Sequence, residues 1–231
     1  MKFSDLLIII PAYNEEGSIE NVVNNIIRNY SQYDYVIIND GSKDRTSAIC
    51  HANGYNIVDL SVNLGLAGAF QTGLRYAYEQ GYKKAVQFDA DGQHLAEYIR
   101  VLEEKSDEGF ELVIGSRFVT EKRDSSLRML GNTLISAAIK LTTGKTINDP
   151  TSGMRLFTEG LIKEFALNVN YGPEPDTVSY LLNNGVKVAE VQVLMQERQA
   201  GESYLTLSRS IKYMVHMFVS ILIIQNFRKR G

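Results

Sequence analysis

The chain has 231 residues, enough to bury the core of one large domain. Its charged fraction of 22% and apolar fraction of 44% are those of a soluble globular protein, and a net charge of −3 gives no reason to expect a nucleic-acid partner. The single cysteine, Cys50, excludes an internal disulfide and fits a reducing compartment. The first residues lack the pattern of a secretory signal peptide, so we expect a cytoplasmic protein.

The first half of the chain is predicted to alternate between short strands and helices. Apolar runs bounded by turn residues predict strands at Leu6–Ile10, Tyr35–Ile38, Asn56–Leu60, Ala85–Phe88 and Glu111–Ile114. The stretches between them predict helices at Ser18–Tyr30, Asp44–Ala52, Leu66–Gln80 and Ala96–Lys105. This alternation is typical of an α/β fold with a mainly parallel central sheet and helices on both faces.

Three acid-bearing loops follow the first, second and fourth predicted strands, beginning at Pro11, Asn39 and Asp89. Because ligands bind outside the carboxyl ends of the strands in such a sheet, three polar loops at one edge predict a binding site there. The side chains of Asp89 and Asp91 are two residues apart in an extended segment and should project to the same side. Two such anions repel each other unless a cation lies between them, and a hard divalent ion shared with substrate phosphates fits oxygen ligands. The alternative is an ordinary acidic turn.

Three glycines fall near the start of the third predicted helix. Gly65 and Gly68 are expected to open a helix whose N-terminus approaches an anionic ligand. For Gly73 the same role and a purely structural one, close packing of the helix on the sheet, both stay open.

These loops resemble those of the inverting family 2 glycosyltransferases, which have the nucleotide-diphospho-sugar binding fold called GT-A. Within that family the chain is most similar to the polyprenyl-phosphate sugar transferases, the dolichol-phosphate mannose synthase-like group. The resemblance spans about residues 5–205, and the segments that carry it are 10–16, 39–42, 63–69, 89–94, 115–117, 149–155 and 197–203.

The resemblance implies a site for a nucleotide-sugar donor and a metal ion, Mg²⁺ or Mn²⁺. The residues that it places against the donor are Pro11, Tyr13, Glu15, Asp40, Gly68, Asp89 and Ala90. Asp40 would accept a hydrogen bond from the base, and Asp89, Asp91 and Gln93 would hold the metal, with Asp91 also counted as catalytic. The family often has two acids where this chain has Asn39-Asp40, and this change weakly favours a uridine donor.

The acceptor is left open between two chemical classes. A sugar hydroxyl needs a general base, for which Glu174 and Asp176 are the candidates, although they also fit an acidic loop before a helix at 177–184. A lipid phosphate is already anionic and needs cations instead. The candidates are Arg117, Arg198 and Arg128, each of which could also pair with a surface carboxylate.

The C-terminal segment from Tyr213 to Ile224 is apolar around most of a helix, with a polar stripe at Ser208, Lys212, His216 and Ser220. Its roughly 18 Å as a helix is too short to span a bilayer. It is expected to lie in the headgroup region with the basic 228–230 run anchored to anionic lipid, to meet a membrane partner, or to pack on the protein's own core. We therefore divide the chain into a catalytic domain, 1–205, and an amphipathic associating helix, 206–231.

Together these features predict a metal-dependent inverting glycosyltransferase on the cytoplasmic side, peripherally associated with the inner face of the cell membrane. It would move a sugar from a nucleotide diphosphate, a UDP-sugar by the Asn39 argument, to polyprenyl (undecaprenyl) phosphate for cell-envelope polysaccharide synthesis. The resemblance implies a small multi-pass membrane protein as a possible partner, and a homo-oligomer stays open. Alternatives are transfer to a glycan or lipid-linked saccharide hydroxyl, and a nucleotidyltransferase. The latter is disfavoured because no Gly-rich phosphate loop follows the first strand.

Overall fold

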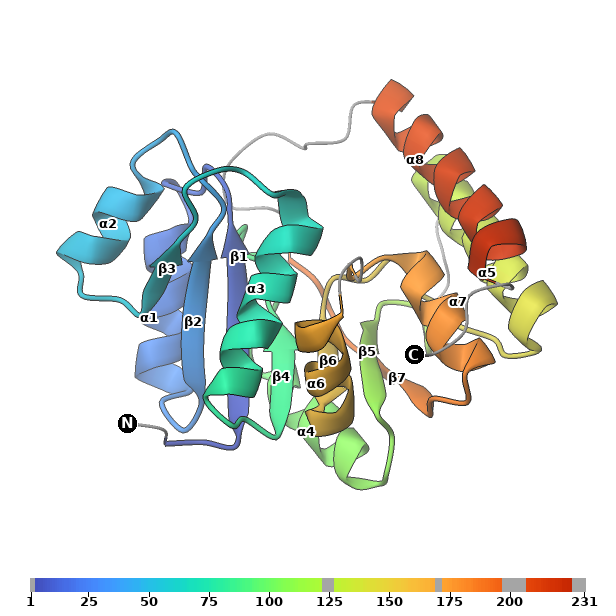
Figure 1. Ribbon diagram of the computed structural model, residues 1–231, viewed down its shortest axis with the longest axis horizontal. Helices are drawn as coiled ribbons and strands as arrows, with labels where there is room; N and C mark the ends of the chain where they lie inside the picture. The colour runs from blue at the N-terminus through green and yellow to red at the C-terminus, as the bar shows by residue number, and fades with distance from the viewer. Residues whose placement is uncertain (1–2, 122–126, 169–171, 197–206, 226–231) are drawn as a thin grey trace.

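The computed structural model describes residues 3–121, 127–168, 172–196 and 207–225, with only the backbone at 127–128 and 207–211. Within these ranges one sheet has the strand order β3-β2-β1-β4-β6-β5-β7 (Figure 1). The strands are β1 (Leu6–Ala12), β2 (Asp34–Asn39), β3 (Ile57–Asp59), β4 (Lys84–Gln87), β5 (Leu112–Ser116), β6 (Arg155–Thr158) and β7 (Val188–Gln192). The helices are α1 (Ile19–Asn29), α2 (Thr46–Ala52), α3 (Gly65–Glu79), α4 (Tyr98–Asp107), α5 (Leu127–Thr143), α6 (Glu159–Leu167), α7 (Pro175–Asn183) and α8 (Leu207–Val219), which continues into the π-helical turn η1 (Ser220–Ile224).

The predicted mainly parallel sheet is confirmed. Strand β1 pairs in parallel with β2 and β4, and β2 pairs in parallel with β3. The carboxyl ends of β1, β2 and β4 therefore lie side by side, as the sequence predicted for the three polar loops. Among the described strands, β6 is the antiparallel one, inserted between β4 and β5, and β7 pairs in parallel with β5. Strands β6 and β7 were not predicted from the sequence.

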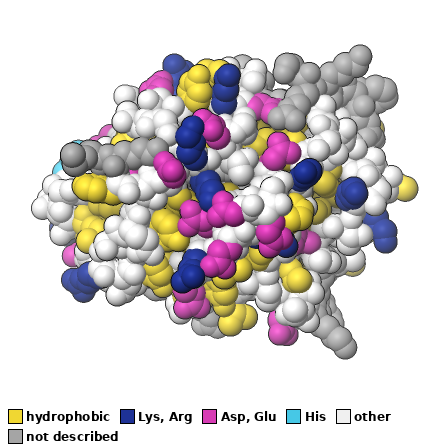
Figure 2. All heavy atoms as spheres, turned by 90° about the horizontal axis from the view of Figure 1, so that it is seen from below, with side chains coloured by type: hydrophobic (Ala, Val, Ile, Leu, Met, Phe, Trp, Pro, Cys, Tyr) yellow, Lys and Arg dark blue, Asp and Glu magenta, His cyan; other side chains and the backbone are white. Residues whose placement is uncertain are grey.

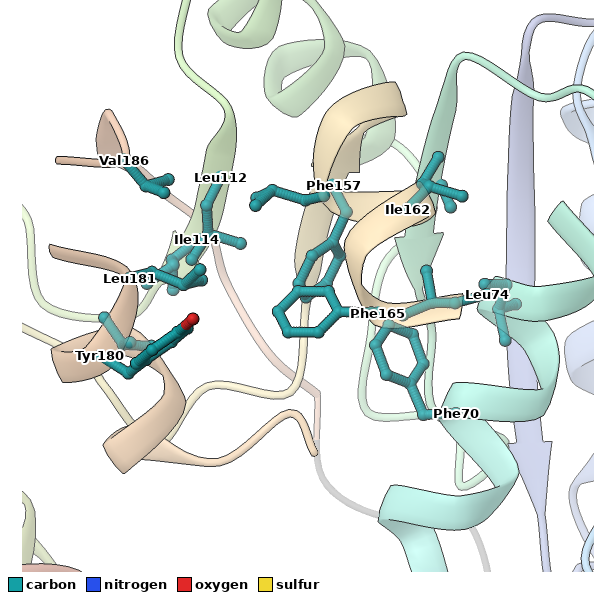
Figure 3. Close-up of a cluster of buried hydrophobic side chains, with 14 of the residues drawn as sticks. Phe70, Leu74, Leu112, Ile114, Phe157, Ile162, Phe165, Tyr180, Leu181 and Val186 are labelled. Carbon is teal, nitrogen blue, oxygen red and sulfur yellow. The ribbon is translucent and has the colours of Figure 1, made fainter. Parts of the chain in front are cut away.

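Helices cover both faces of the sheet, which explains the continuous apolar run of β1. Alternate residues of this strand enter different cores: Leu7 and Ile9 pack with α3 residues, whereas Ile8 packs with α1 residues. In the first core the ring of Phe157 lies 5.3 Å from that of Phe70 (Figure 3). The site at the end of β1 therefore rests on a strand that is buried from both sides.

A second group of helices, α5, α7 and α8, lies beyond β5 and β7 (Figure 1). Helices α5 and α8 run side by side, and a Cβ at Gly131 of α5 would lie only 1.7 Å from the Met214 sulfur, so the glycine permits their close approach. Met217 and Ile221 are buried in the same core as Tyr180. The inner face of the C-terminal helix thus packs on the protein's own core. The division expected between 205 and 206 lies outside the described residues.

The outer faces of α5 and α8–η1 are apolar and exposed, and together we call them the apolar helix surface. Their exposed fractions run from 39% to 80% in Leu130, Leu134, Leu141, Val215, Phe218, Val219, Ile223 and Ile224. In the part of the chain that the structure describes, no helix is both long enough and apolar enough to cross a membrane. Of the predicted polar stripe, Lys212 and His216 are exposed but Ser220 is buried.

The face seen from below Figure 1 has a different character. Figure 2 shows Lys and Arg side chains intermixed with Asp and Glu side chains on it, and hydrophobic side chains scattered between them. Among the described residues such charges form ion pairs, as between Lys84 and Asp107 at 2.6 Å and between Lys83 and Glu159 at 2.6 Å. A charged, mixed surface of this kind is ordinary for a water-exposed face.

The contact of α3 with the sheet gives a stability prediction. A Cβ at Gly73 would lie 2.2 Å from the Cγ2 atom of Ile9, so Gly73→Ala overpacks the core. We expect a loss of about 1–3 kcal/mol in the free energy of unfolding, measured by urea denaturation. Gly160→Ala is the matched control, because nothing lies within 4 Å of its added Cβ and it should be neutral or slightly stabilising. Equal stability of the two variants would contradict the packing role of Gly73.

Candidate functional site

Asp40 joins the end of β2 to the start of α3. Its Oδ1 atom accepts a hydrogen bond from the Leu64 amide at 2.7 Å, and its own amide donates to the Ala12 carbonyl at 2.8 Å. Burial raises the pKa of Asp40, while hydrogen bonds from the Leu64 and Gly65 amides oppose that shift. The carboxylate thus lies at the edge of the sheet where the first two polar loops meet, at a helix N-terminus.

Asn39, beside Asp40, is engaged within the protein. Its Nδ2 donates to Asp59 Oδ1 at 2.6 Å, and its Oδ1 accepts the Ser42 amide at 3.2 Å. The second oxygen of Asp59 lies 2.6 Å from His51 Nε2. Asn39 therefore organises the turn after β2 and its link to β3. Both amide atoms of Asn39, from which the preference for uridine was predicted, take part in hydrogen bonds within the protein.

The first polar loop is closed by hydrogen bonds around Glu15. Its amide donates to the Thr46 hydroxyl at 2.8 Å, and its carboxylate accepts from Ser18 at 2.8 Å. Pro11 lies within β1 beside Ile38 of β2, and Tyr13 is half-buried at the rim. The structure thus places these residues, which were predicted to bind the nucleotide-sugar donor, on the same edge of the sheet as Asp40.

The third polar loop carries the two carboxylates predicted to hold a metal. Asp91 is buried, and its Oδ1 accepts the Gln93 amide at 3.0 Å. The Asp89 side chain is 34% exposed, and its Oδ1 accepts from Gln87 Nε2 at 3.2 Å. Ala90 between them is buried and packs in the core under the loop. The carboxylates are therefore held by their own strand and turn, at the carboxyl end of β4.

The side-chain oxygen atoms of Asp89, Asp91 and Gln93 fit a divalent cation whose remaining coordination positions are filled by a bound ligand. Within the described ranges, no group of three or more His, Cys, Asp or Glu side chains could hold a metal. Two carboxylates leave several positions open, and Mg²⁺-type ions commonly fill these with water and substrate phosphates. Gln93 Nε2 donates to the Gln196 carbonyl at 3.4 Å, which leaves its Oε1 as the amide atom for a cation.

The predicted glycines at the start of α3 have separate roles. Gly65 has a φ of +76° and opens the helix, as expected. A Cβ at Gly68 would lie 2.5 Å from the Leu64 Cβ, so that position must stay small for the first turn to form. For Gly73 the structure supports the packing role against β1.

Arg117 forms a forked ion pair with buried Asp149. The Nε–Oδ2 distance is 2.6 Å and the Nη2–Oδ1 distance is 2.8 Å, and Nη1 takes no part in the pair. Asn132 of α5 donates to the same carboxylate at 2.9 Å. Burial alone would raise the pKa of Asp149, but the hydrogen bonds and charge of Arg117, with the Thr151 hydroxyl, hold it below its usual range.

Arg155, at the start of β6, is almost completely buried, and its role was not predicted from the sequence. It donates to three carbonyl oxygens, those of Ser152 at 2.9 Å, Pro150 at 2.6 Å and Glu174 at 3.3 Å. Burial lowers the pKa of its guanidinium, and the nearby Glu174 carboxylate opposes that shift. The one available signal was its place in the 149–155 segment, which begins with the partner of Arg117.

The two candidate bases are both hydrogen-bonded to the C-terminal helix. Glu174 accepts from the Tyr213 hydroxyl. Asp176 accepts from Ser220 at 2.7 Å and from Gln225 at 3.0 Å. Burial and the Glu174 charge raise the pKa of Tyr213, so the phenol keeps its proton and donates it to this bond. Both carboxylates therefore tie α7 to α8–η1. Arg198 and the side chain of Arg128 lie outside the described residues.

The chain is similar to a known protein family and to several known proteins. The model of the family described as glycosyl transferase family 2 matches residues 7–165. The UDP-N-acetylglucosamine–dolichyl-phosphate N-acetylglucosaminyltransferase of Methanococcus voltae is 36% identical over 68% of this chain and 71% of that protein. The polyprenol monophosphomannose synthase of Mycolicibacterium smegmatis is 28% identical over 85% of this chain and 79% of that protein.

Among solved structures, glucosyl-3-phosphoglycerate synthase from Mycobacterium tuberculosis, in complex with Mn²⁺, uridine diphosphate and phosphoglyceric acid, has a similar fold. The TM-score is 0.71 at 19% identity, over 97% of this chain and 79% of that one. At this identity the similarity shows the fold, and it confirms the predicted GT-A architecture.

The Arg117–Asp149 pair gives a prediction on stability and pH. Asp149→Asn leaves a mostly buried guanidinium without its counter-charge, which should cost about 3 kcal/mol of unfolding free energy at pH 7. Because the folded-state pKa of Asp149 is lowered, its stabilisation is complete above the unfolded pKa of about 3.9 and is lost as the pH falls through the folded value. Urea denaturation should therefore show the difference from wild type shrinking below pH 4.

Asp107→Asn is the control for this prediction, since its pair with Lys84 is largely exposed on the Asp107 side. It should cost less than about 1 kcal/mol. A loss for Asp149→Asn as small as for the control would show that the buried pair does not organise this loop.

Proposed function

The chain belongs to glycosyl transferase family 2 and is a glycosyltransferase, and from this premise we propose that it transfers a sugar from a nucleotide diphosphate to polyprenyl phosphate. The observation that carries the proposal is that Asp40, Asp89 and Asp91 lie at one edge of the sheet. Two relatives of the chain are named for dolichyl phosphate and for polyprenol monophosphomannose. We expect the acceptor to be undecaprenyl phosphate, as the sequence resemblance implies.

The donor side is assigned from the geometry of the polar loops. Asp40 lies at the N-terminus of α3, where its carboxylate would accept a hydrogen bond from the base of the nucleotide. Asp89 and Asp91, with Gln93, would hold a divalent cation against the diphosphate. A UDP-sugar is proposed because the Methanococcus relative is named for one and the solved structure of similar fold contains uridine diphosphate.

A phosphate acceptor needs no general base, and this agrees with the roles of Glu174 and Asp176. Each carboxylate accepts hydrogen bonds from the C-terminal helix, so neither is an unengaged base. A phosphate oxygen would attack the anomeric carbon as the bond from that carbon to the diphosphate breaks, which inverts the configuration and requires no proton transfer from the nucleophile. A bound divalent cation would supply Lewis-acid neutralisation of the charge that develops on the leaving diphosphate.

Arg117 is proposed to contact the acceptor phosphate from the edge of β5. The pair with Asp149 fixes the guanidinium through Nε and Nη2 and leaves Nη1 for an anion. Arg198 and Arg128 remain candidates from the sequence.

The acceptor's lipid tail gives a reason for the apolar helix surface. Its side chains come from both α5 and α8–η1, whose inner faces are packed on the core. We propose that this surface lies in the headgroup region of a membrane, with the protein on the cytoplasmic side, or against a small multi-pass membrane protein. The inner packing would then hold the catalytic edge at a set height above the lipid.

Product chemistry separates the two acceptor classes. With labelled UDP-sugars and polyprenyl phosphate, the expected product is a sugar phosphodiester that mild acid cleaves. Glu174→Gln and Asp176→Asn should keep kcat within about tenfold of wild type, because neither group removes a proton. A general base would contribute about 10²–10⁴-fold, so a loss of that size with an acid-stable glycoside as product would establish a hydroxyl acceptor instead.

Asp91→Asn is the companion variant for the metal. It should lower turnover by at least about 10²-fold, equivalent to a few kcal/mol of lost transition-state stabilisation, without changing the unfolding midpoint. EDTA should abolish the wild-type activity, and Mn²⁺ or Mg²⁺ should restore it. Full activity in EDTA would refute the metal assignment.

The membrane proposal is tested on the outer surface alone. Phe218→Glu and Leu134→Glu place charges on the apolar helix surface and should reduce cosedimentation with anionic lipid vesicles by about tenfold or more. Because both side chains point outward, the unfolding midpoint and the binding of uridine diphosphate should stay unchanged. Val101→Glu, at an exposed apolar position on α4, is the control and should sediment like wild type. Unaltered sedimentation of both surface variants would refute the proposal.

A further inference from the structure

His94 lies directly against Asp89 and is almost inaccessible to solvent, with a side chain that is 2% exposed. Its Nδ1 accepts the backbone amide hydrogen of Asp89 at 2.9 Å. A ring nitrogen that accepts carries no proton, so the neutral imidazole has its proton on Nε2. The ring therefore presents an acceptor to the Asp89 backbone and a donor on its other side.

That second nitrogen faces the Asp89 carboxylate. The distance from Nε2 to Asp89 Oδ2 is 3.6 Å, longer than a hydrogen bond but within reach of a small movement of the carboxylate. The turn that carries Gly153 lies close to this pair. A Cβ at Gly153 would lie 2.7 Å from Asp89 Oδ2 and 3.3 Å from His94 Cε1, which explains the glycine at this position.

The ring is itself held in place. It packs edge-on against the buried ring of Phe88, with the centroids 5.5 Å apart. The backbone of His94 forms an antiparallel bridge with Met195, and the next hydrogen bond joins the Gln196 amide to the Gln93 carbonyl at 2.9 Å. The imidazole is thus held rigidly, and its hydrogen bond to the Asp89 amide fixes the loop that carries Asp89 and Asp91.

We propose that His94 is a positioning residue for the metal site: through its Nδ1 bond to the Asp89 backbone it sets the direction in which the Asp89 carboxylate meets the cation. Gln87 Nε2 donates to Oδ1 of the same carboxylate at 3.2 Å, whereas His94 Nε2 lies 3.6 Å from its Oδ2. The inference rests on the proposed metal-dependent function. Partners that orient a metal ligand commonly change metal affinity 10–100-fold when lost.

The test compares His94→Asn with His94→Gln and His94→Leu. An Asn side chain can place its Oδ1 where Nδ1 lies and accept the Asp89 amide hydrogen; a Gln amide reaches the Nε2 position instead, and Leu offers no acceptor. The measurement is the Kd for Mn²⁺ in saturating uridine diphosphate, from electron paramagnetic resonance of free Mn²⁺. His216→Leu is the matched control, since His216 is exposed on α8.

We expect the Kd for Mn²⁺ to rise about 10–100-fold in the Gln and Leu variants and to stay within about threefold of wild type in the Asn variant and the control. At saturating Mn²⁺ the Gln variant should regain most of its kcat, because the ligand itself is intact. Should His94→Leu fail to fold, the comparison of His94→Asn with His94→Gln still tests the role of His94.

Two results would overturn the inference: an unchanged Kd in His94→Gln, or an equal loss in His94→Asn and His94→Gln. Either would leave the metal-dependent function standing, because wild type still binds Mn²⁺. If wild type does not bind Mn²⁺ with uridine diphosphate, the proposed metal site fails, and the role of His94 fails with it.

Discussion

The half of the molecule beyond β4 is built around one buried cation. The Arg155 guanidinium has no contact with water, and removing such an ion from water costs several kcal/mol unless its protons find acceptors and its charge finds counter-charges. Three backbone carbonyls supply the acceptors, and the carboxylates of Asp149, Glu174 and Asp176 supply negative charge around it. The loop before β6, the N-terminus of α7 and β6 itself must therefore meet at this point.

The same carboxylates also form hydrogen bonds with the end of β5 and with the C-terminal helix. Asp149 holds Arg117 at the end of β5, and Glu174 and Asp176 hold Tyr213 and Ser220 of the C-terminal helix. The C-terminal helix, whose outer face is proposed to meet lipid, is thus attached to the rest of the protein by hydrogen bonds as well as by its buried Met217 and Ile221. A displacement of α8 would act on the edge of the sheet through these bonds.

The sequence predicted the parallel strands of the first half of the chain well because local patterns determine them. Parallel strands that each end in a polar loop bring those loops to one edge whatever the loop details are, so Asp40, Asp89 and Asp91 could be assigned together. It predicted side-chain partners poorly. Arg117 was left open between a phosphate ligand and an ion-pair partner, and Glu174 between a general base and an acidic loop, because their partners Asp149 and Tyr213 are 32 and 39 residues away. Strand β6 was missed for a similar reason, since its place between β4 and β5 follows from packing and not from its four-residue pattern.

The segment from Asp149 to Arg155 connects the two halves. Its first residue pairs with Arg117, its last is the buried cation, and Gly153 between them lies against Asp89 and His94. The Ser152 hydroxyl, in the same turn, donates to the Gly115 carbonyl of β5 at 2.5 Å. Because protein interiors are close-packed, a displacement of this turn cannot be absorbed locally. It must move either the Asp89 carboxylate on one side or the Arg117 guanidinium on the other. In the proposed reaction these two groups hold the donor diphosphate and the acceptor phosphate, so this one short turn would set the distance between the two reactants.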